Sequence, residues 1–244
     1  MSPTLHVVSD PDSLGAVAGS ILVDALRAAI RSRGLGRLAI PGGRSPRPVF
    51  DWLAAHLPAE VAAKTIVTWV DERHVPQIEL DASWSALPEA SNLRGAWEAW
   101  FSRAAHRPRI VPLAHPGELE GARSAVSDRF ADALGGLDVV LLGAGPAGHI
   151  ASLFPDHPAG SATRAVIAVP DSPKPPPERL TLSLPVLQQV DCAVLVASGA
   201  DRAAMLARAW AGDPALPLGQ YQPRGAWHWV VDPAAAAHLP KDAP

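Results

Sequence analysis

The stretch L-D-V-V-L-L-G-A-G-P-A-G-H-I-A-S-L-F-P, residues 137–155, decides the fold that we predict for this chain. Its apolar run, residues 139–142, lies close to glycines on both sides and is typical of a buried parallel strand. The glycines and proline of residues 143–148 then turn the chain sharply at the carboxyl end of that strand. Open α/β sheets bind ligands at this edge. His149, whose unperturbed pKa lies near neutrality, follows the turn, so the stretch predicts a functional site.

Predicted strands and helices alternate along the rest of the chain. Short apolar runs predict strands at residues 5–9, 37–40, 66–70, 110–111, 165–169, 193–197 and 226–231. Apolar residues at helical spacing predict helices at residues 11–33, 48–57, 91–101, 118–134 and 201–210. This alternation indicates an α/β, doubly wound fold, a mainly parallel sheet with helices on both faces. No internal repeat or linker divides the sequence, so we predict a single domain over residues 1–244.

The composition is that of a globular protein. The chain has 244 residues, of which 48% are apolar, and a net charge of −3 with a pI near 6.3. This charge is not the basic footprint of a nucleic-acid binder. Cys192 is the single cysteine and allows no internal disulfide, and the sequence shows no signal-peptide pattern or membrane-length apolar run. We therefore expect a cytoplasmic protein without nucleic-acid or membrane partners.

Residues 41–46, P-G-G-R-S-P, follow a predicted strand and precede a predicted helix. The amides of Gly42 and Gly43, the positive end of the helix and the charge of Arg44 could together hold a phosphate. Ser45 could cap the helix. An ordinary strand-to-helix turn has the same features, and the two interpretations carry about equal weight. The lysine and the spacing of a Walker loop are absent.

Charged residues follow other predicted strands at the same sheet edge. D-E-R-H-V-P, residues 71–76, brings two acids, Asp71 and Glu72, beside Arg73, and these are either a solvated charge cluster or part of a site. Arg179 and Arg202 lie where the chain re-enters this edge, so each is either a surface residue or a bidentate phosphate ligand. As a general base, His74 is a weaker candidate than the histidine of the glycine turn.

The glycines of residues 143–148 match the dinucleotide fingerprint G-x-G-x-x-G. That fingerprint requires a helix packed on the strand and an acidic residue about 20 positions further on, at the end of a second strand. Here Pro155 ends the segment within two turns, and the next predicted strand ends too far downstream. We therefore predict no nucleotide cofactor at this turn.

The motifs, taken in order, resemble those of the 6-phosphogluconolactonase family. The resemblance rests on G-G-R-S-P, W-V-D-E-R-H-V-P, Ser91-Asn92, L-G-A-G-P-A-G-H-I-A-S-L-F-P, P-P-P-E-R-L-T-L and G-A-D-R. It covers nearly the whole chain, and H-I-A-S-L-F-P is its most specific part. It implies a modified Rossmann-like, doubly wound fold of the kind shared by sugar-phosphate isomerases and deaminases.

The resemblance also implies an activity, the hydrolysis of 6-phospho-D-glucono-1,5-lactone to 6-phosphogluconate in the oxidative pentose phosphate pathway, without a metal or nucleotide. The implied partner is this small sugar-phosphate lactone, and the implied assembly is a monomer or weak homo-oligomer. His149 would be the general base, Asp71 would hold a sugar hydroxyl or the histidine, and the glycine turn or Arg73 would stabilise the oxyanion. The residues implied to bind the substrate and its phosphate are Gly42, Gly43, Arg44, Ser45, Asn92, Gly145, Gly148, Arg179 and Arg202.

Three departures from the family pattern bear on activity. The aspartate that precedes Gly-His in the family is Ala147 here, the late lysine is Arg202, and the span before Ser91 is longer. Two alternatives stay open: an amino-sugar phosphate deaminase/isomerase, whose family carries D-E-Y in place of D-E-R, and a catalytically silent sugar-phosphate-binding protein. A flavin or nicotinamide protein is a third.

Overall fold

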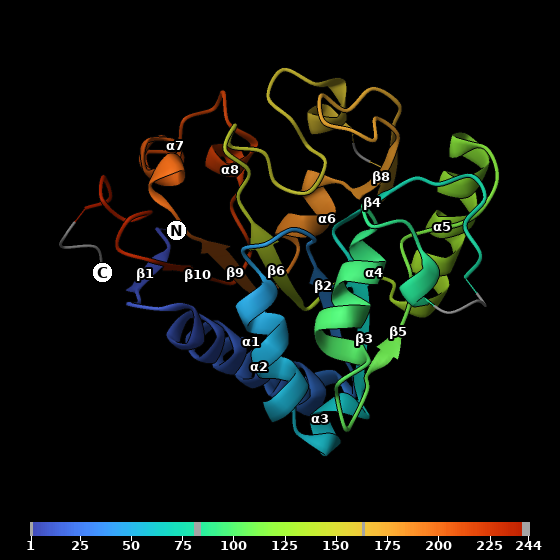
Figure 1. The fold of residues 1–244 in the computed structure, drawn as a ribbon, viewed down its shortest axis with the longest axis horizontal. Coiled ribbons are helices and arrows are strands. Elements are labelled where there is room, and N and C mark those ends of the chain that lie inside the picture. The colour runs from blue at the N-terminus through green and yellow to red at the C-terminus, as the bar shows by residue number, and fades with distance from the viewer. Residues whose placement is uncertain (1, 81–83, 163, 241–244) are drawn as a thin grey trace.

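The computed structural model describes residues 2–80, 84–162 and 164–240 and is built on a parallel sheet of seven strands (Figure 1). The strand order is β1-β10-β9-β6-β2-β3-β5, and every neighbouring pair is parallel. The strands are β1 (Thr4–Val7), β2 (Gly36–Ile40), β3 (Thr65–Trp69), β5 (Arg109–Ile110), β6 (Val139–Gly143), β9 (Cys192–Ala197) and β10 (Ala226–Val231). The predicted α/β fold with a mainly parallel sheet is confirmed.

The winding direction of the chain changes between β2 and β6, which pair side by side at the centre of the sheet. From β2 the chain builds outward through β3 to β5, and from β6 it builds the other way through β9 to β10. Such a switch point leaves a crevice at the carboxyl ends of the two central strands, where ligands of open α/β sheets bind. The opening stretch of the sequence supplies one of these strands.

A second, antiparallel sheet of three strands was not predicted. Its order is β4 (Asp71–Arg73), β8 (Arg179–Leu182), β7 (Val166–Val169). The strand predicted at residues 165–169 exists as β7 but belongs to this sheet and not to the parallel one. Val70 joins the two sheets, since its N–H donates to Ile40 at 2.9 Å while its carbonyl accepts from Leu182 at 2.8 Å. Strands of three or four residues carry too few side chains to show a period.

The longest helix, α1 (Pro11–Arg33), begins and ends as its sequence predicts. Asp10 accepts a hydrogen bond from the Ser13 N–H at 2.8 Å, and Gly34 ends the helix with φ +77°. By length and composition α1 could cross a membrane, so the expectation that no segment reaches that length is wrong. Its buried side chains, Leu22 and Leu26 among them, pack on β2, β6, β9 and β10, which accounts for the apolar character.

The remaining helices are shorter. They are α2 (Arg47–His56), α3 (Ala59–Ala62), α4 (Asn92–Ala96) with a π-helical extension (Trp97–Phe101), α5 (Leu119–Ala133), α6 (Leu184–Gln188), α7 (Ala203–Trp210) and α8 (Pro217–Gln220). Single 3₁₀ turns occupy Trp84–Ala86, Pro158–Ser161 and Ala200–Arg202. Buried apolar side chains from both sheets and most helices form one cluster. The predicted single domain stays a prediction, and this shared core supports it.

Candidate functional site

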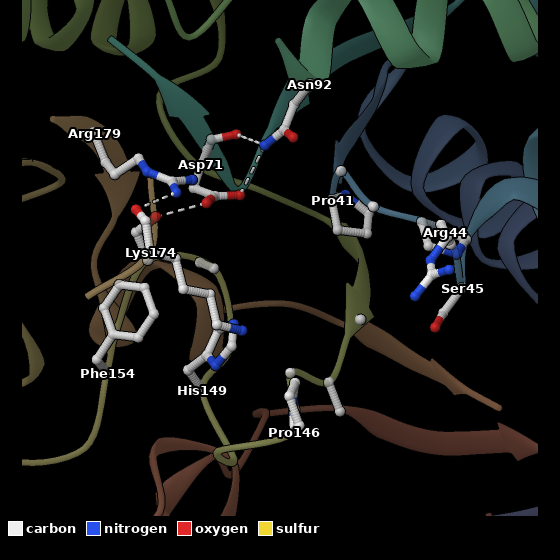
Figure 2. A pocket seen from close by; sticks show the side chains of 18 of the residues that line it. Pro41, Arg44, Ser45, Asp71, Asn92, Pro146, His149, Phe154, Lys174 and Arg179 are labelled. Atoms are coloured by element: carbon white, nitrogen blue, oxygen red, sulfur yellow. Dashed lines mark hydrogen bonds between the residues drawn. The ribbon is translucent and has the colours of Figure 1, made fainter. Parts of the chain in front are cut away.

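A cavity of about 440 Å³ lies at the switch point of the sheet (Figure 2). The segments that line it follow β2, β3, β6 and β9 or belong to the loop between β7 and β8. Because carboxyl ends of parallel strands meet at one edge, residues far apart in sequence converge here. The residues predicted for the site that line the cavity are Gly42, Gly43, Arg44, Ser45, Asp71, Arg73, Asn92, Gly145, His149, Arg179 and Arg202.

Gly148, also predicted for the site, is not among the lining residues. Its φ is +76°, and a Cβ atom there would lie 2.8 Å from Leu216 Cδ2, on the side of α8. Its N–H donates to the Gly145 carbonyl at 2.9 Å, and its carbonyl accepts from the Leu218 N–H at 3.0 Å. Gly148 therefore shapes the turn and docks it on α8, because a side chain would be strained at that backbone conformation.

The turn after β2 brings Gly42, Gly43, Arg44 and Ser45 to one wall of the cavity. A Cβ atom at Gly42 would lie 1.7 Å from Asn92 Oδ1, so only glycine permits this close approach. The predicted cap by Ser45 is wrong, since α2 has no side-chain cap and its N-cap residue is Pro46. The first turn of α2 offers few N–H donors, because its prolines have none and the Arg47 N–H is bonded to a carbonyl. The turn amides, the Ser45 hydroxyl and the exposed Arg44 are therefore available anion ligands on this wall.

His149 faces the same cavity from the opposite wall in Figure 2. Its ring packs against Phe154, with centroids 4.8 Å apart, and a Cβ atom at Gly145 would lie 1.7 Å from its Cε1. Burial first, then the charges of Lys174 and Arg179, lower the pKa of His149 from 6.5 to about 4. The imidazole is therefore neutral at neutral pH and can accept a proton.

Asp71 is held in place by two donors from other elements (Figure 2). Asn92 Nδ2 donates to its Oδ1 at 3.2 Å and to its main-chain carbonyl at 2.8 Å, while Ser152 Oγ donates to its Oδ2 at 2.6 Å. Within residues 2–80, 84–162 and 164–240, no hydrogen bond joins Asp71 to His149. Of the two roles predicted for Asp71, contact with a ligand hydroxyl fits this geometry better than holding the histidine.

The two late arginines use much of their hydrogen-bonding capacity within the protein. Arg179 Nε donates to the Pro176 carbonyl at 2.8 Å, and its Nη2 donates to the Lys174 carbonyl at 3.0 Å. Arg202 Nη1 donates to the Ser198 carbonyl at 2.7 Å, and its Nε donates to a carbonyl of the glycine turn at 3.2 Å. Loop carbonyls therefore engage Nε and one Nη of each guanidinium, and the predicted bidentate contact with a phosphate stays a prediction. Both residues still contribute positive charge to the cavity.

Glu72, predicted only as one of the two acids beside Arg73, organises the region behind Asp71. Its carboxylate accepts hydrogen bonds from the N–H groups of Arg73 at 2.7 Å, Asn92 at 2.7 Å and Leu93 at 2.6 Å, and from Ser91 Oγ at 3.2 Å. The side chain is 1% exposed, and burial raises the pKa of Glu72 to about 7 against the opposing effect of these donors. Glu72 therefore fixes the start of α4, from which Asn92 reaches Asp71.

Two of the lining residues that were not predicted carry polar side chains, Ser152 and Lys174. Ser152 belongs to H-I-A-S-L-F-P, whose specificity could have drawn attention to it. Lys174 lies in the proline-rich loop, where the sequence offers no periodic signal. In the part of the chain that the structure describes, no group of three or more His, Cys, Asp or Glu side chains is placed to hold a metal ion.

The cavity carries a marked positive charge around a neutral base. Its cationic side chains are Arg44, Arg73, Lys174, Arg179 and Arg202. A parallel α/β sheet with such a cavity at its switch point defines the class of small-anion-binding α/β proteins.

Comparison with known proteins assigns the family. A family model described as glucosamine-6-phosphate isomerases/6-phosphogluconolactonase matches residues 9–229. The chain is 35% identical to the 6-phosphogluconolactonase of Mycobacterium tuberculosis, over 98% of this chain and 100% of that protein. It is 32% identical to the human 6-phosphogluconolactonase, over 96% and 93% of the two chains. The chain belongs to the glucosamine-6-phosphate isomerase/6-phosphogluconolactonase family.

Solved structures agree on the fold. The crystal structure of 6-phosphogluconolactonase from Thermotoga maritima superposes with a TM-score of 0.81 at 23% identity, covering 94% of this chain and 99% of that one. A monomeric glucosamine-6-phosphate deaminase superposes with a TM-score of 0.76 at 18% identity, covering 96% and 99%. Because both activities occur on this fold, the fold alone does not choose between them.

Proposed function

We propose that this protein hydrolyses 6-phospho-D-glucono-1,5-lactone to 6-phosphogluconate, a step of the oxidative pentose phosphate pathway. The observation that carries the proposal is a neutral histidine, His149, in a cavity lined by five cationic side chains. The cations suit a phosphorylated substrate, and the neutral imidazole suits the activation of water. The relatives at 32–35% identity that carry the lactonase name support the same activity.

In the proposed reaction, His149 takes a proton from a water molecule as the water oxygen attacks C1 of the lactone. The carbonyl oxygen becomes an oxyanion, and a tetrahedral intermediate forms. The bond between C1 and the ring oxygen then breaks, and the proton on His149 passes to that oxygen. Asp71, fixed by Asn92 and Ser152, accepts a hydrogen bond from a hydroxyl of the sugar ring. This contact orients C1 for attack.

The 6-phosphate would lie against the wall formed by the turn after β2. The amides of Gly42 and Gly43, the hydroxyl of Ser45 and the exposed guanidinium of Arg44 offer it hydrogen bonds. Arg202 adds charge from across the cavity. Binding energy from the phosphate, remote from the reacting carbon, would then hold the lactone ring in position.

The deaminase/isomerase alternative fits this chain less well. Arg73 stands where that family carries tyrosine, and Ala147 stands where it carries the acid used for proton transfer. A catalytically silent sugar-phosphate-binding protein would keep the same cavity. One assay distinguishes the proposed activity from the two alternatives. Purified protein is given the phosphorylated lactone and, separately, glucosamine 6-phosphate. We expect lactone hydrolysis above the spontaneous rate and no ammonia release; ammonia release, or binding without turnover, would contradict the proposal.

A methyl group at Gly145 is expected to reduce activity sharply. The added Cβ in Gly145→Ala would lie 1.7 Å from His149 Cε1, so the imidazole must move. A shift of about 1 Å in a catalytic group costs up to about 100-fold in rate. The matched control is Gly121→Ala in α5, outside the cavity, where a Cβ atom meets nothing within 4 Å. Equal kcat values for the two variants would show that the ring position is unimportant.

Restoring the family's carboxylate at position 147 is expected to raise the pKa of His149. Ala147 lies two residues before His149, whose Nδ1 is buried and has no hydrogen-bond partner within the described residues. A negative charge nearby favours the imidazolium form. In Ala147→Asp the acid limb of the pH–rate profile should therefore move to higher pH from about 4. In Ala147→Asn, whose side chain has the shape of aspartate without its charge, the limb should not move. Coincident profiles for the two variants would exclude this electrostatic coupling.

Cytoplasmic location and a monomeric or weakly associated state stay predictions. Light scattering during size-exclusion chromatography measures the oligomeric state directly.

A further inference from the structure

The loop between β7 and β8 is held in a defined conformation around Lys174. Arg179 donates hydrogen bonds to the carbonyls of Lys174, Pro175 and Pro176 at 3.0, 3.3 and 2.8 Å. From the other side, Ser172 Oγ donates to the Lys174 carbonyl at 3.1 Å and accepts from the Lys174 N–H at 3.3 Å. These contacts fix the main chain from which the Lys174 side chain leaves. The loop therefore presents the lysine in one direction.

That direction is into the cavity, beside His149 (Figure 2). Lys174 lines the cavity, and of the charged groups acting on His149 it has the largest effect, ahead of Arg179. Across the residues with described positions, no hydrogen bond or ion pair engages Lys174 Nζ. Its three donors are available to a ligand.

Two other candidates for an oxyanion donor, the glycine turn and Arg73, already make hydrogen bonds within the protein. In the glycine turn, the Gly145 N–H donates to the His149 carbonyl at 3.1 Å, and the Gly148 N–H donates to the Gly145 carbonyl at 2.9 Å. Arg73 directs Nη1 at the Ala90 carbonyl. Each donor named for this role from the sequence is therefore engaged in part by the protein itself, although Arg73 Nε has no partner among the described residues. The Lys174 ammonium, with no partner among those residues, is a further donor in the cavity.

We propose that Lys174 is a catalytic residue, whose ammonium donates a hydrogen bond to the lactone carbonyl oxygen and stabilises the oxyanion that forms on it. This assignment rests on the proposed function. As the water oxygen bonds to C1, the electron pair of the carbonyl π bond moves to the oxygen facing Lys174, and it returns when the bond from C1 to the ring oxygen breaks. No proton leaves the lysine, since the water proton travels through His149. A base and an oxyanion donor thus lie side by side at the reacting carbon.

The rival role for Lys174 is that of a phosphate ligand, and kinetics separate the two. The variants are Lys174→Met, which removes the charge, and Lys174→Arg, which keeps it; Lys64→Met is the control, because Lys64 is exposed and lies outside the cavity. Thermal unfolding monitored by circular dichroism verifies that each variant folds. For each we would measure kcat and KM with the phosphorylated lactone and the inhibition constant of inorganic phosphate.

We expect Lys174→Met to lower kcat by about 100-fold, the loss that follows removal of one oxyanion donor, with KM and phosphate inhibition nearly unchanged. Lys174→Arg should recover part of the loss, and Lys64→Met should match the unmodified protein. The acid limb of the pH–rate profile should also move to higher pH in Lys174→Met, because loss of a nearby positive charge raises the pKa of His149. Only one positive charge is lost, since Arg44, Arg73, Arg179 and Arg202, together with Asp71, still line the cavity.

Other outcomes overturn the assignment. If Lys174→Met raises KM and weakens phosphate inhibition while kcat holds, the lysine binds phosphate. If its kcat equals that of Lys64→Met, the lysine takes no part. If the unmodified protein itself fails to hydrolyse the lactone, the proposed function falls first, and that result is distinct from a defect confined to the variant.

Discussion

Replacing His149 with alanine is expected to lower kcat/KM for the phosphorylated lactone by about 10²–10⁴-fold, the range that positioned acid–base groups contribute. The alanine variant cannot take the proton from the attacking water, while the cationic wall that binds the phosphate is unchanged, so KM should change little. The control is His106→Ala, which removes an exposed histidine outside the cavity. Rates must be corrected for spontaneous hydrolysis. If His149→Ala and His106→Ala hydrolyse the lactone equally fast, His149 is not the base.

The pH dependence gives the same variant a second, independent readout. The pKa of His149 is lowered from 6.5 to about 4, so the unfolded chain binds this proton more readily than the folded protein. His149 therefore lowers the free energy of unfolding as pH falls from about 6.5 to about 4. In His149→Ala that loss is absent, and urea unfolding across this range should show a flatter dependence. A slope identical to that of the unmodified protein would mean that the imidazole is not buried as described.

The sequence predicted where the site lies because strand ends are local features. Apolar runs ended by glycine or by charged residues mark the carboxyl edge of a parallel sheet, and geometry brings those ends together. Residues as distant in sequence as Gly42, Asp71 and His149 are therefore predicted to lie at one edge of the sheet, and all three line the cavity. The antiparallel sheet was missed because β4, with three residues, shows no pattern and continues directly from β3.

What each side chain does within the cavity could not be predicted in the same way. The guanidinium of Arg179 bonds to carbonyls of its own proline-rich loop, and that of Arg202 bonds to the turns after β6 and β9. These partners exist only once the loops have folded. These contacts engage part of each guanidinium, whereas the Lys174 ammonium has no partner among the residues described. Local sequence identifies charged residues at an edge, but tertiary contacts decide which of them remain available to a ligand.

Glu72 shows how a buried carboxylate can support a site without entering it. It accepts main-chain hydrogen bonds from Arg73, Asn92 and Leu93, and thereby ties β4 to the start of α4. Asn92 in turn donates to Asp71. Removing the carboxylate leaves buried N–H groups without acceptors, and each such group costs about 1–3 kcal/mol. The loss therefore reaches both the fold and the position of Asp71.

We expect Glu72→Ala to lower the free energy of unfolding by about 3–5 kcal/mol, measured by urea denaturation. The control is Glu60→Ala, since Glu60 is exposed and forms only a surface ion pair with Arg27 at 3.5 Å. Such pairs contribute about 0–1 kcal/mol. Glu72→Gln keeps one acceptor oxygen and should lie between the two. A loss no larger than that of Glu60→Ala would contradict the organising role of Glu72.

The sign of the pH dependence tests the same assignment more sharply. Burial raises the folded-state pKa of Glu72 from 4.5 to about 7, so between these values the folded protein keeps a proton that the unfolded chain has released. The contribution of Glu72 to the free energy of unfolding is therefore fully present below about 4.5, declines as pH rises to about 7 and is constant above. The stability difference between the unmodified protein and Glu72→Ala should shrink over that interval. A difference that grows with pH would mean that the three N–H donors outweigh burial, and that Glu72 is held as a carboxylate whose charge stabilises the start of α4.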